Sequence, residues 1–176
     1  MRYVAFLRAI NVGGRNITMA ELRELFEGMG LGSVDTFIAS GNVIFESKKK
    51  PDRLEKLISA GLRESLGYPV PTFLRTLPEL VAVTGAQPFE AEVVSAAAAY
   101  NVAFTENTVT TEQRSRLAAF RTQFDDFAAI GREIFWICRV RQSESRFANA
   151  AMERSLGTSV TWRGINTVRR LVARYG

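Results

Sequence analysis

Residues 3–46, YVAFLRAINVGGRNITMAELRELFEGMGLGSVDTFIASGNVIFE, carry the hydrophobic pattern from which the fold class is predicted. The run at residues 3–7 is hydrophobic at every position, which is typical of a strand covered on both faces. Thr18 and the glutamate three residues later have the spacing of a capping box, which predicts that a helix starts there. Two further strands are predicted at residues 34–39 and 42–46. The order is therefore strand, helix, strand, strand.

A second helix and a fourth strand complete this pattern, which then recurs. Residues 48–50 are three lysines, which we interpret as a solvated turn, and Pro51 starts a helix because proline is favoured in the first helical turn. A strand is predicted at residues 70–75. Residues 99–163 repeat the order strand, helix, strand, strand, helix, strand, with Gly131 in the turn of a hairpin.

This doubled order predicts an α+β protein made of two tandem ferredoxin-like units that pack together. Extra helices are expected at residues 77–84 and 167–175. The expected boundaries are 1–75 for the first unit, 76–98 for a connecting helix and loop, and 99–176 for the second unit with its terminal helix. Strands that are apolar on both faces imply that the open face of each sheet is covered, and the other unit is the simplest cover.

Composition excludes several chemistries. The chain has no histidine and one cysteine, Cys138, so His-dependent catalysis, zinc binding and internal disulfides are excluded. Cys138 lies in a predicted buried strand, where we expect it to serve core packing. Gly13 and Gly14 match neither a dinucleotide-binding motif nor a phosphate-binding P-loop. We interpret the adjacent Asp125 and Asp126 as solvated acids rather than a metal site, and we expect no cofactor and no metal.

The chain also lacks the features of a membrane or secreted protein. The hydrophobic run before Arg8 is too short for the core of a signal peptide, and no stretch approaches the roughly 20 apolar residues that span a bilayer. We therefore expect a soluble, cytoplasmic protein without a membrane partner.

Positive charge is concentrated in the second half of the chain. Residues 1–96 contain 11 basic and 11 acidic side chains, whereas residues 97–176 contain 12 basic and 7 acidic ones. All 12 of those basic residues are arginine, which binds carboxylate and phosphate through two parallel hydrogen bonds. Two interpretations stay open: a genome that encodes positive charge as arginine, or an anion-binding face for a phosphorylated ligand or nucleic acid.

The loop between the first strand and the first helix is a candidate anion site. Arg8 ends the strand, and residues 11–16, NVGGRN, lead to the helix start. Gly13 and Gly14 allow close approach of backbone N–H groups, and Arg15 adds positive charge. The alternative is ordinary turn chemistry, in which glycine and asparagine serve only the loop.

Three segments carry a family resemblance. Residues 6–14, FLRAINVGG, with Asn16, then residues 40–45, SGNVIF, resemble the domain of unknown function 1697 family of bacteria. Residues 161–168, TWRGINTV, are similar to its third signature, usually Thr-Thr-Arg-Asn-Trp-Asn-Thr-Val, and depart from it at positions 162, 164 and 165. The resemblance runs nearly end to end and implies tandem ferredoxin-like units, with no established activity.

If these three signatures converge, their polar residues line one cleft between the units. The candidate ligand-binding residues are Arg8, Asn11, Gly13, Gly14, Arg15, Asn42, Arg163, Asn166 and Thr167. The alternative assigns each asparagine a structural task. Asn11 and Asn42 would then fasten loops, and Asn166 would be the N-cap of the last helix.

Two functional hypotheses follow. The leading one is a cytoplasmic protein that binds a small anionic or phosphorylated ligand at the junction of the two units, with any catalysis left open. The alternative is a non-enzymatic nucleic-acid or protein-interaction module that uses the arginine-rich second half. Nucleic acid is the less favoured partner, because residues 42–45 lack the basic-aromatic signature of RNA-recognition folds. Both a monomer and a homodimer through the apolar surface near Phe135 and Trp136 are compatible with the sequence.

Overall fold

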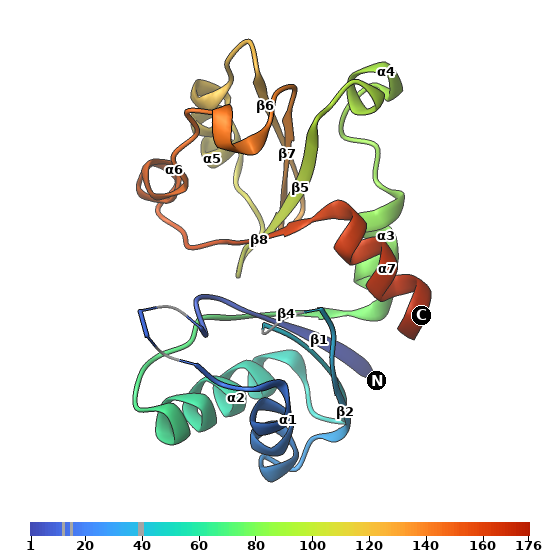
Figure 1. Ribbon diagram of the computed structural model, residues 1–176, viewed down its shortest axis with the longest axis vertical. Helices are drawn as coiled ribbons and strands as arrows, with labels where there is room; N and C mark the ends of the chain where they lie inside the picture. Colours follow the sequence, from blue (N-terminus) through green and yellow to red (C-terminus); the bar gives the residue numbers. More distant parts are fainter. Residues whose placement is uncertain (12, 15, 39–40) are drawn as a thin grey trace. The chain divides into compact units, whose positions relative to one another are not determined.

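The computed structural model describes residues 1–11, 13–14, 16–38 and 41–176 (Figure 1). The chain forms two compact units. The first comprises Met1–Val81 together with Leu171–Gly176, and the second comprises Ala82–Arg170. Each unit contains one four-stranded antiparallel sheet, so the protein is a mixed α+β protein with two such sheets.

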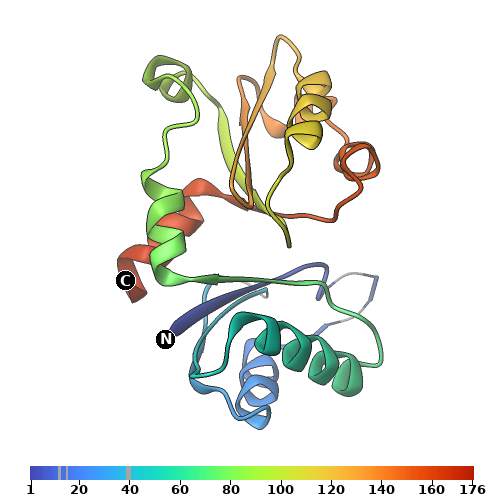
Figure 2. The same cartoon turned by 180° about the vertical axis from the view of Figure 1, so that it is seen from behind.

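The first unit is built around the central strand β1. Its elements are β1 (Arg2–Leu7), α1 (Met19–Gly28), β2 (Gly32–Thr36), β3 (Asn42–Glu46), α2 (Pro51–Leu66) and β4 (Thr72–Thr76), after which α3 (Leu77–Gly85) leads out of the unit. The sheet has the strand order β2-β3-β1-β4, and β1 pairs antiparallel with both β3 and β4. Helices α1 and α2 cover one face of this sheet, as both Figure 1 and Figure 2 show.

Local sequence signals set the helix starts of this unit. Thr18 and Glu21 form the predicted capping box at α1, in which each side chain accepts a hydrogen bond from the other residue's backbone N–H. Thr76 and Glu79 make the same reciprocal pair at α3. Pro51 is the first residue of α2, as predicted. These starts were predictable because a cap depends on residues within one turn of the chain.

The core of the first unit lies between the sheet and its two helices. It includes Phe45 of β3 and Phe26 of α1, both fully buried, and their ring centroids lie 5.7 Å apart. The opposite face of the same sheet is also buried, including Phe6 and the guanidinium-bearing Arg75, which is 1% exposed. Burial on both faces agrees with the continuous apolar pattern of β1.

The carboxy-terminal residues belong to the first unit. The Tyr175 hydroxyl donates a hydrogen bond to Oδ2 of Asp35 on β2, and Arg2 of β1 donates to the Tyr175 carbonyl oxygen at 2.7 Å. The Tyr175 ring meets the Phe37 ring edge-on at 5.9 Å. Burial by itself raises the pKa of Asp35. The hydrogen bonds from Tyr175 and the Thr36 backbone, with the charges of nearby arginines, nevertheless bring it below its ordinary value.

This contact predicts a pH dependence of stability. Burial and the bond to Asp35 raise the pKa of Tyr175 to about 12, whereas an unfolded tyrosine titrates near ~10. A group whose pKa rises on folding stabilises the folded state at low pH, and that contribution is lost as the pH rises between about 10 and about 12. We therefore expect the thermal midpoint of the wild type to fall more steeply over this range than that of Tyr175→Phe. Parallel profiles in thermal scans of the two proteins would show that the bond adds nothing.

The second unit repeats the element order of the first. Its elements are α4 (Ala91–Ser95), β5 (Ala99–Phe104), α5 (Thr111–Leu117), a short 3-10 turn (Ala118–Phe120), β6 (Asp125–Ile130), β7 (Glu133–Cys138), a second 3-10 turn (Gln142–Glu144), α6 (Asn149–Leu156), β8 (Thr161–Gly164) and the start of α7 (Ile165–Tyr175). The sheet order is β6-β7-β5-β8, and β5 pairs with both β7 and β8. Helices α5 and α6 lie on one face of this sheet (Figures 1 and 2).

Aromatic side chains dominate the core of the second unit. Phe147 lies 4.8 Å from Trp136 and 4.9 Å from Phe127, measured between ring centroids, and Trp162 closes the cluster. Cys138 is fully buried, as predicted, and burial raises the pKa of its thiol. The thiol is therefore held in its unreactive neutral form.

Two sequence interpretations are wrong in this unit. Asp125 is not a solvated acid: it is 2% exposed and accepts hydrogen bonds from Trp136 Nε1 and the Ser145 hydroxyl. Asn166 is not an N-cap, because α7 already starts at Ile165, directly after β8. A cap needs a non-helical residue before the helix, and here the last strand runs straight into it.

Among the described residues, no helix is long and apolar enough to cross a membrane.

Candidate functional site

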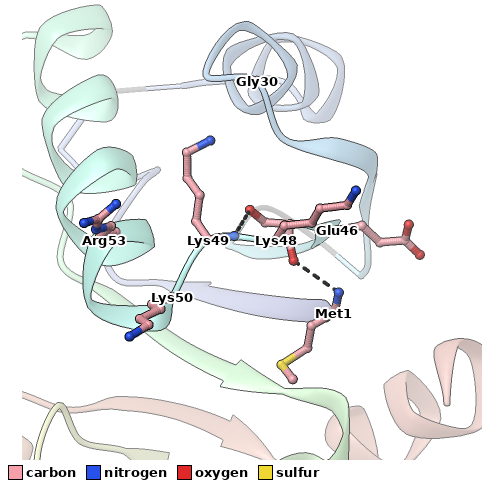
Figure 3. Close-up of a pocket in the computed structure, with 8 residues that line it drawn as sticks. Met1, Gly30, Glu46, Lys48, Lys49, Lys50 and Arg53 are labelled. Carbon is pink, nitrogen blue, oxygen red and sulfur yellow. Dashed lines mark hydrogen bonds between the residues drawn. The ribbon is translucent and has the colours of Figure 1, made fainter.

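A positively charged pocket lies in the first unit, where β3 ends and α2 begins (Figure 3). It has a volume of about 770 Å³. Its lining comes from the first residue of the chain, the turn after α1, the end of β3, the turn that follows it and the start of α2: Met1, Gly30, Glu46, Ser47, Lys48, Lys49, Lys50 and Arg53. Four of these side chains are cationic, and one is acidic.

The turn between β3 and α2 is held by backbone hydrogen bonds and one hydroxyl. The Ser47 hydroxyl accepts from the Lys49 backbone N–H at 3.1 Å, and the Ser47 carbonyl accepts from the Met1 nitrogen at 3.1 Å. In Figure 3 the Lys49 side chain extends toward the turn at Gly30, whereas Lys50 points away from that turn. The fixed backbone thus presents Lys49 across the pocket.

The single acid of the pocket does not cancel its charge. Glu46 forms an ion pair with Arg2 at 2.9 Å and accepts a hydrogen bond from the Ser33 hydroxyl at 3.3 Å. The hydrogen bond from Arg2 is the main reason that the pKa of Glu46 is lowered. Because Glu46 is already neutralised by a cation from β1, the pocket keeps the positive potential of its own lysines and Arg53. Such a concave positive surface attracts anions.

The pocket was not predicted from the sequence, where residues 48–50 were interpreted as a solvated turn. The lysines are indeed exposed, so that interpretation is correct for the turn alone. The local pattern does not show that Gly30, in the turn after α1, also lines the pocket. The only available signal was the charge run KKKPDR at a predicted helix start, and charge runs of this kind are usually just solvated.

In the first unit, the predicted loop residues lie at the end of β1. Asn11 holds its own loop: its Oδ1 accepts from the Ile17 N–H at 2.9 Å and its Nδ2 donates to the Ile17 carbonyl at 3.4 Å. Gly13 and Gly14 have φ values of 68° and 80°, which glycine adopts without strain. The Arg8 backbone N–H donates to the Pro71 carbonyl at 2.9 Å. Arg15 lies outside the described residues.

Asn42 has a comparable structural task. It is 3% exposed, and its Nδ2 donates to the carbonyl oxygens of Phe37 and Ile38 at 2.9 and 3.1 Å. These bonds fasten the connection between β2 and β3. The Asn11 and Asn42 side chains therefore both hold loops, and binding of a ligand by either one stays a prediction.

In the second unit, the strand register separates the predicted residues. Arg163 pairs with Val102 and Gly164 with Asn101, so Arg163 and Gly164 face opposite sides of the sheet. Arg163 Nη1 donates to the Thr161 hydroxyl and the Trp162 carbonyl at 3.0 and 2.7 Å. Burial lowers the pKa of Arg163 to about 10, so its guanidinium is still charged near neutral pH.

Asn166 and Thr167 lie in the first turn of α7. Asn166 is exposed, and its Oδ1 accepts from Arg169 Nη1 at 3.1 Å. A Cβ placed on Gly164 would lie 3.9 Å from the Thr167 hydroxyl oxygen and 4.0 Å from Asn101 Oδ1. Thr167 and Asn101 therefore lie around Gly164, on the side of the sheet that Arg163 does not face.

Asn101 was not selected from the sequence. It is 8% exposed, and within the described part of the chain its buried Nδ2 has no hydrogen-bond partner. The strand sequence AYNVAF does not predict that the Asn101 amide lacks a partner, because hydrogen bonding of the side chain depends on which residues pack around it.

The two antiparallel sheets, each with helices on one face, define the chain as an α+β protein. The chain belongs to the family described as "Protein of unknown function (DUF1697)", which matches residues 1–135. This confirms the resemblance stated from the sequence.

A solved structure shares this fold. It is that of the conserved bacterial protein SP0830 from Streptococcus pneumoniae, with a TM-score of 0.76 and 23% sequence identity over 98% of this chain and 97% of that chain. No curated protein matches the chain.

Proposed function

We propose that this protein binds a small anionic, phosphate-bearing ligand in the cationic pocket of the first unit. The observation that supports the proposal is the gathering of Lys48, Lys49, Lys50 and Arg53 around one hollow whose single acid is paired with Arg2. Lysine ammonium groups are mobile point charges that donate to phosphoryl oxygens, and arginine can bind two of those oxygens at once.

The size of the pocket indicates the class of ligand. A volume of about 770 Å³ lies within the range of about 300–1,000 Å³ that is typical of small-molecule sites. That is far more than one phosphate fills, so we favour a ligand with two or more phosphate groups, or one phosphate on a larger body. No reaction is assigned to the site.

Two further predictions belong with this proposal. Each unit is proposed to be ferredoxin-like, supported by the order β-α-β-β-α-β and by the matching strand orders β2-β3-β1-β4 and β6-β7-β5-β8. The convergence of the predicted signature residues on one ligand and the cytoplasmic location both stay predictions.

Calorimetric titration with pyrophosphate tests the proposal. In the double variant Lys49→Gln and Arg53→Gln we expect the Kd to rise at least about tenfold, since two charge-assisted contacts are lost. The matched control is Lys56→Gln with Arg63→Gln, which removes the same charge from exposed positions of α2 outside the pocket. Equal weakening in both double variants would reduce the effect to net charge and overturn the site.

The same calorimetric titration, with an oligonucleotide in place of pyrophosphate, distinguishes the nucleic-acid alternative from the proposed function. If a short oligonucleotide binds, its affinity is compared at low and high salt and in the Lys49→Gln, Arg53→Gln variant. An affinity that falls steeply with salt and is unchanged in this variant would assign the function to the arginines of the second half. Several of those arginines are already engaged: Arg116 pairs with Glu112 and Arg121 with Asp126.

A further inference from the structure

Hydrogen bonds connect the cationic pocket of the first unit to the end of α7. Tyr175 is the last residue of α7 and belongs to the first unit. Its carbonyl oxygen accepts a hydrogen bond from Arg2 Nη1 at 2.7 Å, and Arg2 Nη2 donates to Glu46 Oε1 at 2.9 Å. Glu46 lines the pocket, whereas Arg2 and Tyr175 do not. One guanidinium therefore bridges the end of α7 and the acid of the pocket.

Both oxygens of the Glu46 carboxylate accept hydrogen bonds. Oε1 accepts from Arg2, which is its direct partner in the register of β1 and β3, and Oε2 accepts from the Ser33 hydroxyl at 3.3 Å. In Figure 3 the Glu46 carboxylate points away from Lys49 and Arg53. Arg2 and Ser33 thus hold the acid in a direction that keeps it off these two cations of the pocket.

Removal of Arg2 would release this acid. The Glu46 side chain is 45% exposed, so it can change rotamer once its main partner is gone. Lysines and an arginine line the same pocket and become its new partners. A carboxylate that turns onto them competes with a bound anion for the same N–H donors.

The Arg2–Glu46 pair depends on a further contact. The two side chains are 41% and 45% exposed, and an ion pair this exposed holds its geometry only weakly by itself. The Tyr175 carbonyl binds the second nitrogen of the guanidinium and so fixes its direction. Tyr175 in turn is anchored on the first unit, because its hydroxyl donates to Asp35 Oδ2 on β2 and its ring meets Phe37 edge-on at 5.9 Å.

We propose that docking of the end of α7 on the first unit is coupled to anion binding in the cationic pocket, because Tyr175 holds Arg2 and Arg2 holds Glu46 away from the cations. Arg2 and Tyr175 are positioning residues that act through Glu46. Such coupling is reciprocal, so an anion in the pocket also favours the docked end of α7. The inference rests on the proposed function, since it describes regulation of that same site.

Calorimetric titration with pyrophosphate at low salt tests the coupling. In Arg2→Gln and in Tyr175→Ala we expect the Kd to rise about fivefold, the effect of one carboxylate brought close to a multivalent anion. When Glu46→Gln is added, the same two substitutions should change the Kd by less than about twofold, because the competing acid is absent. The matched control is Arg63→Gln, which removes the same charge from an exposed position of α2 outside the pocket.

A second measurement needs no anion. The hydrogen bond from Arg2 is the largest cause of the lowered pKa of Glu46. Carbon-13 NMR of the Glu46 carboxyl group should therefore show this pKa rising toward the ordinary value of about 4.3 in both Arg2→Gln and Tyr175→Ala. An unchanged pKa of Glu46 in Tyr175→Ala would show that α7 does not hold Arg2, and would overturn the proposal.

The titrations separate this inference from the proposed function. A loss of affinity in Arg2→Gln that persists with Glu46→Gln would be an effect of net charge or of folding, and it would overturn the coupling. A wild type that binds no pyrophosphate would overturn the proposed function and the coupling together. Binding that is weakened in the Lys49→Gln, Arg53→Gln variant but unchanged in Tyr175→Ala would overturn the coupling alone.

Discussion

Asp125→Ala is expected to lower the free energy of unfolding of the second unit by about 3 kcal/mol. The Asp125 carboxylate accepts hydrogen bonds from Trp136 Nε1 at 2.8 Å, the Ser145 hydroxyl at 2.9 Å and the Thr122 hydroxyl at 3.0 Å. Alanine would leave these donors without their acceptor, in a place where Asp125 itself is 2% exposed. An unmade hydrogen bond in such a site costs more than the net gain of making it.

Urea unfolding followed by tryptophan fluorescence measures this effect. The chain has two tryptophans, Trp136 and Trp162, and both lie in the second unit, so the signal reports on that unit alone. The adjacent Asp126 provides the matched control. It forms a partly exposed ion pair with Arg121 at 2.8 Å, and Asp126→Ala should cost less than about 1 kcal/mol. Similar losses for the two variants would show that the buried bonds of Asp125 contribute little.

Phe45→Ala is expected to destabilise the first unit by about 3–5 kcal/mol, the range for removal of a large buried aromatic side chain. The Phe45 ring is fully buried and lies 5.7 Å from the rings of both Tyr3 and Phe26. Its removal opens a cavity between β3 and α1 that neighbouring elements of regular structure cannot close. The lost contacts and the cavity therefore add to each other.

In urea unfolding followed by far-UV circular dichroism, Phe45→Ala should show a transition at a lower urea concentration than the wild type. The transition of the second unit, followed by tryptophan fluorescence, should keep its urea midpoint. Met19→Ala is the control, since Met19 is 46% exposed at the start of α1 and its truncation leaves no cavity. A shift of both transitions together would show that the two units unfold as one. An unchanged first transition would contradict the core described around Phe45.

Features that depend only on neighbouring residues were predictable from the amino-acid sequence. The strand 42–46 has the predicted bounds, the hairpin turns at Gly131 as predicted, and the capping box at Thr18 is confirmed. Cys138 is buried, as its apolar strand indicated. Each of these follows from hydrophobic period, turn chemistry or capping within a few residues, and such signals need no knowledge of what packs nearby.

The surroundings of the polar groups, in contrast, depend on how the chain packs. Asp125 looked like a solvated acid until packing placed Trp136 and Ser145 against it. The pocket of the first unit needs Gly30 beside Lys49, and Tyr175 reaches Asp35 across 140 residues of chain. The missing partner of Asn101 is also a property of its surroundings. Burial and charge at these sites come from residues far apart in sequence, and no local pattern encodes which of them will meet.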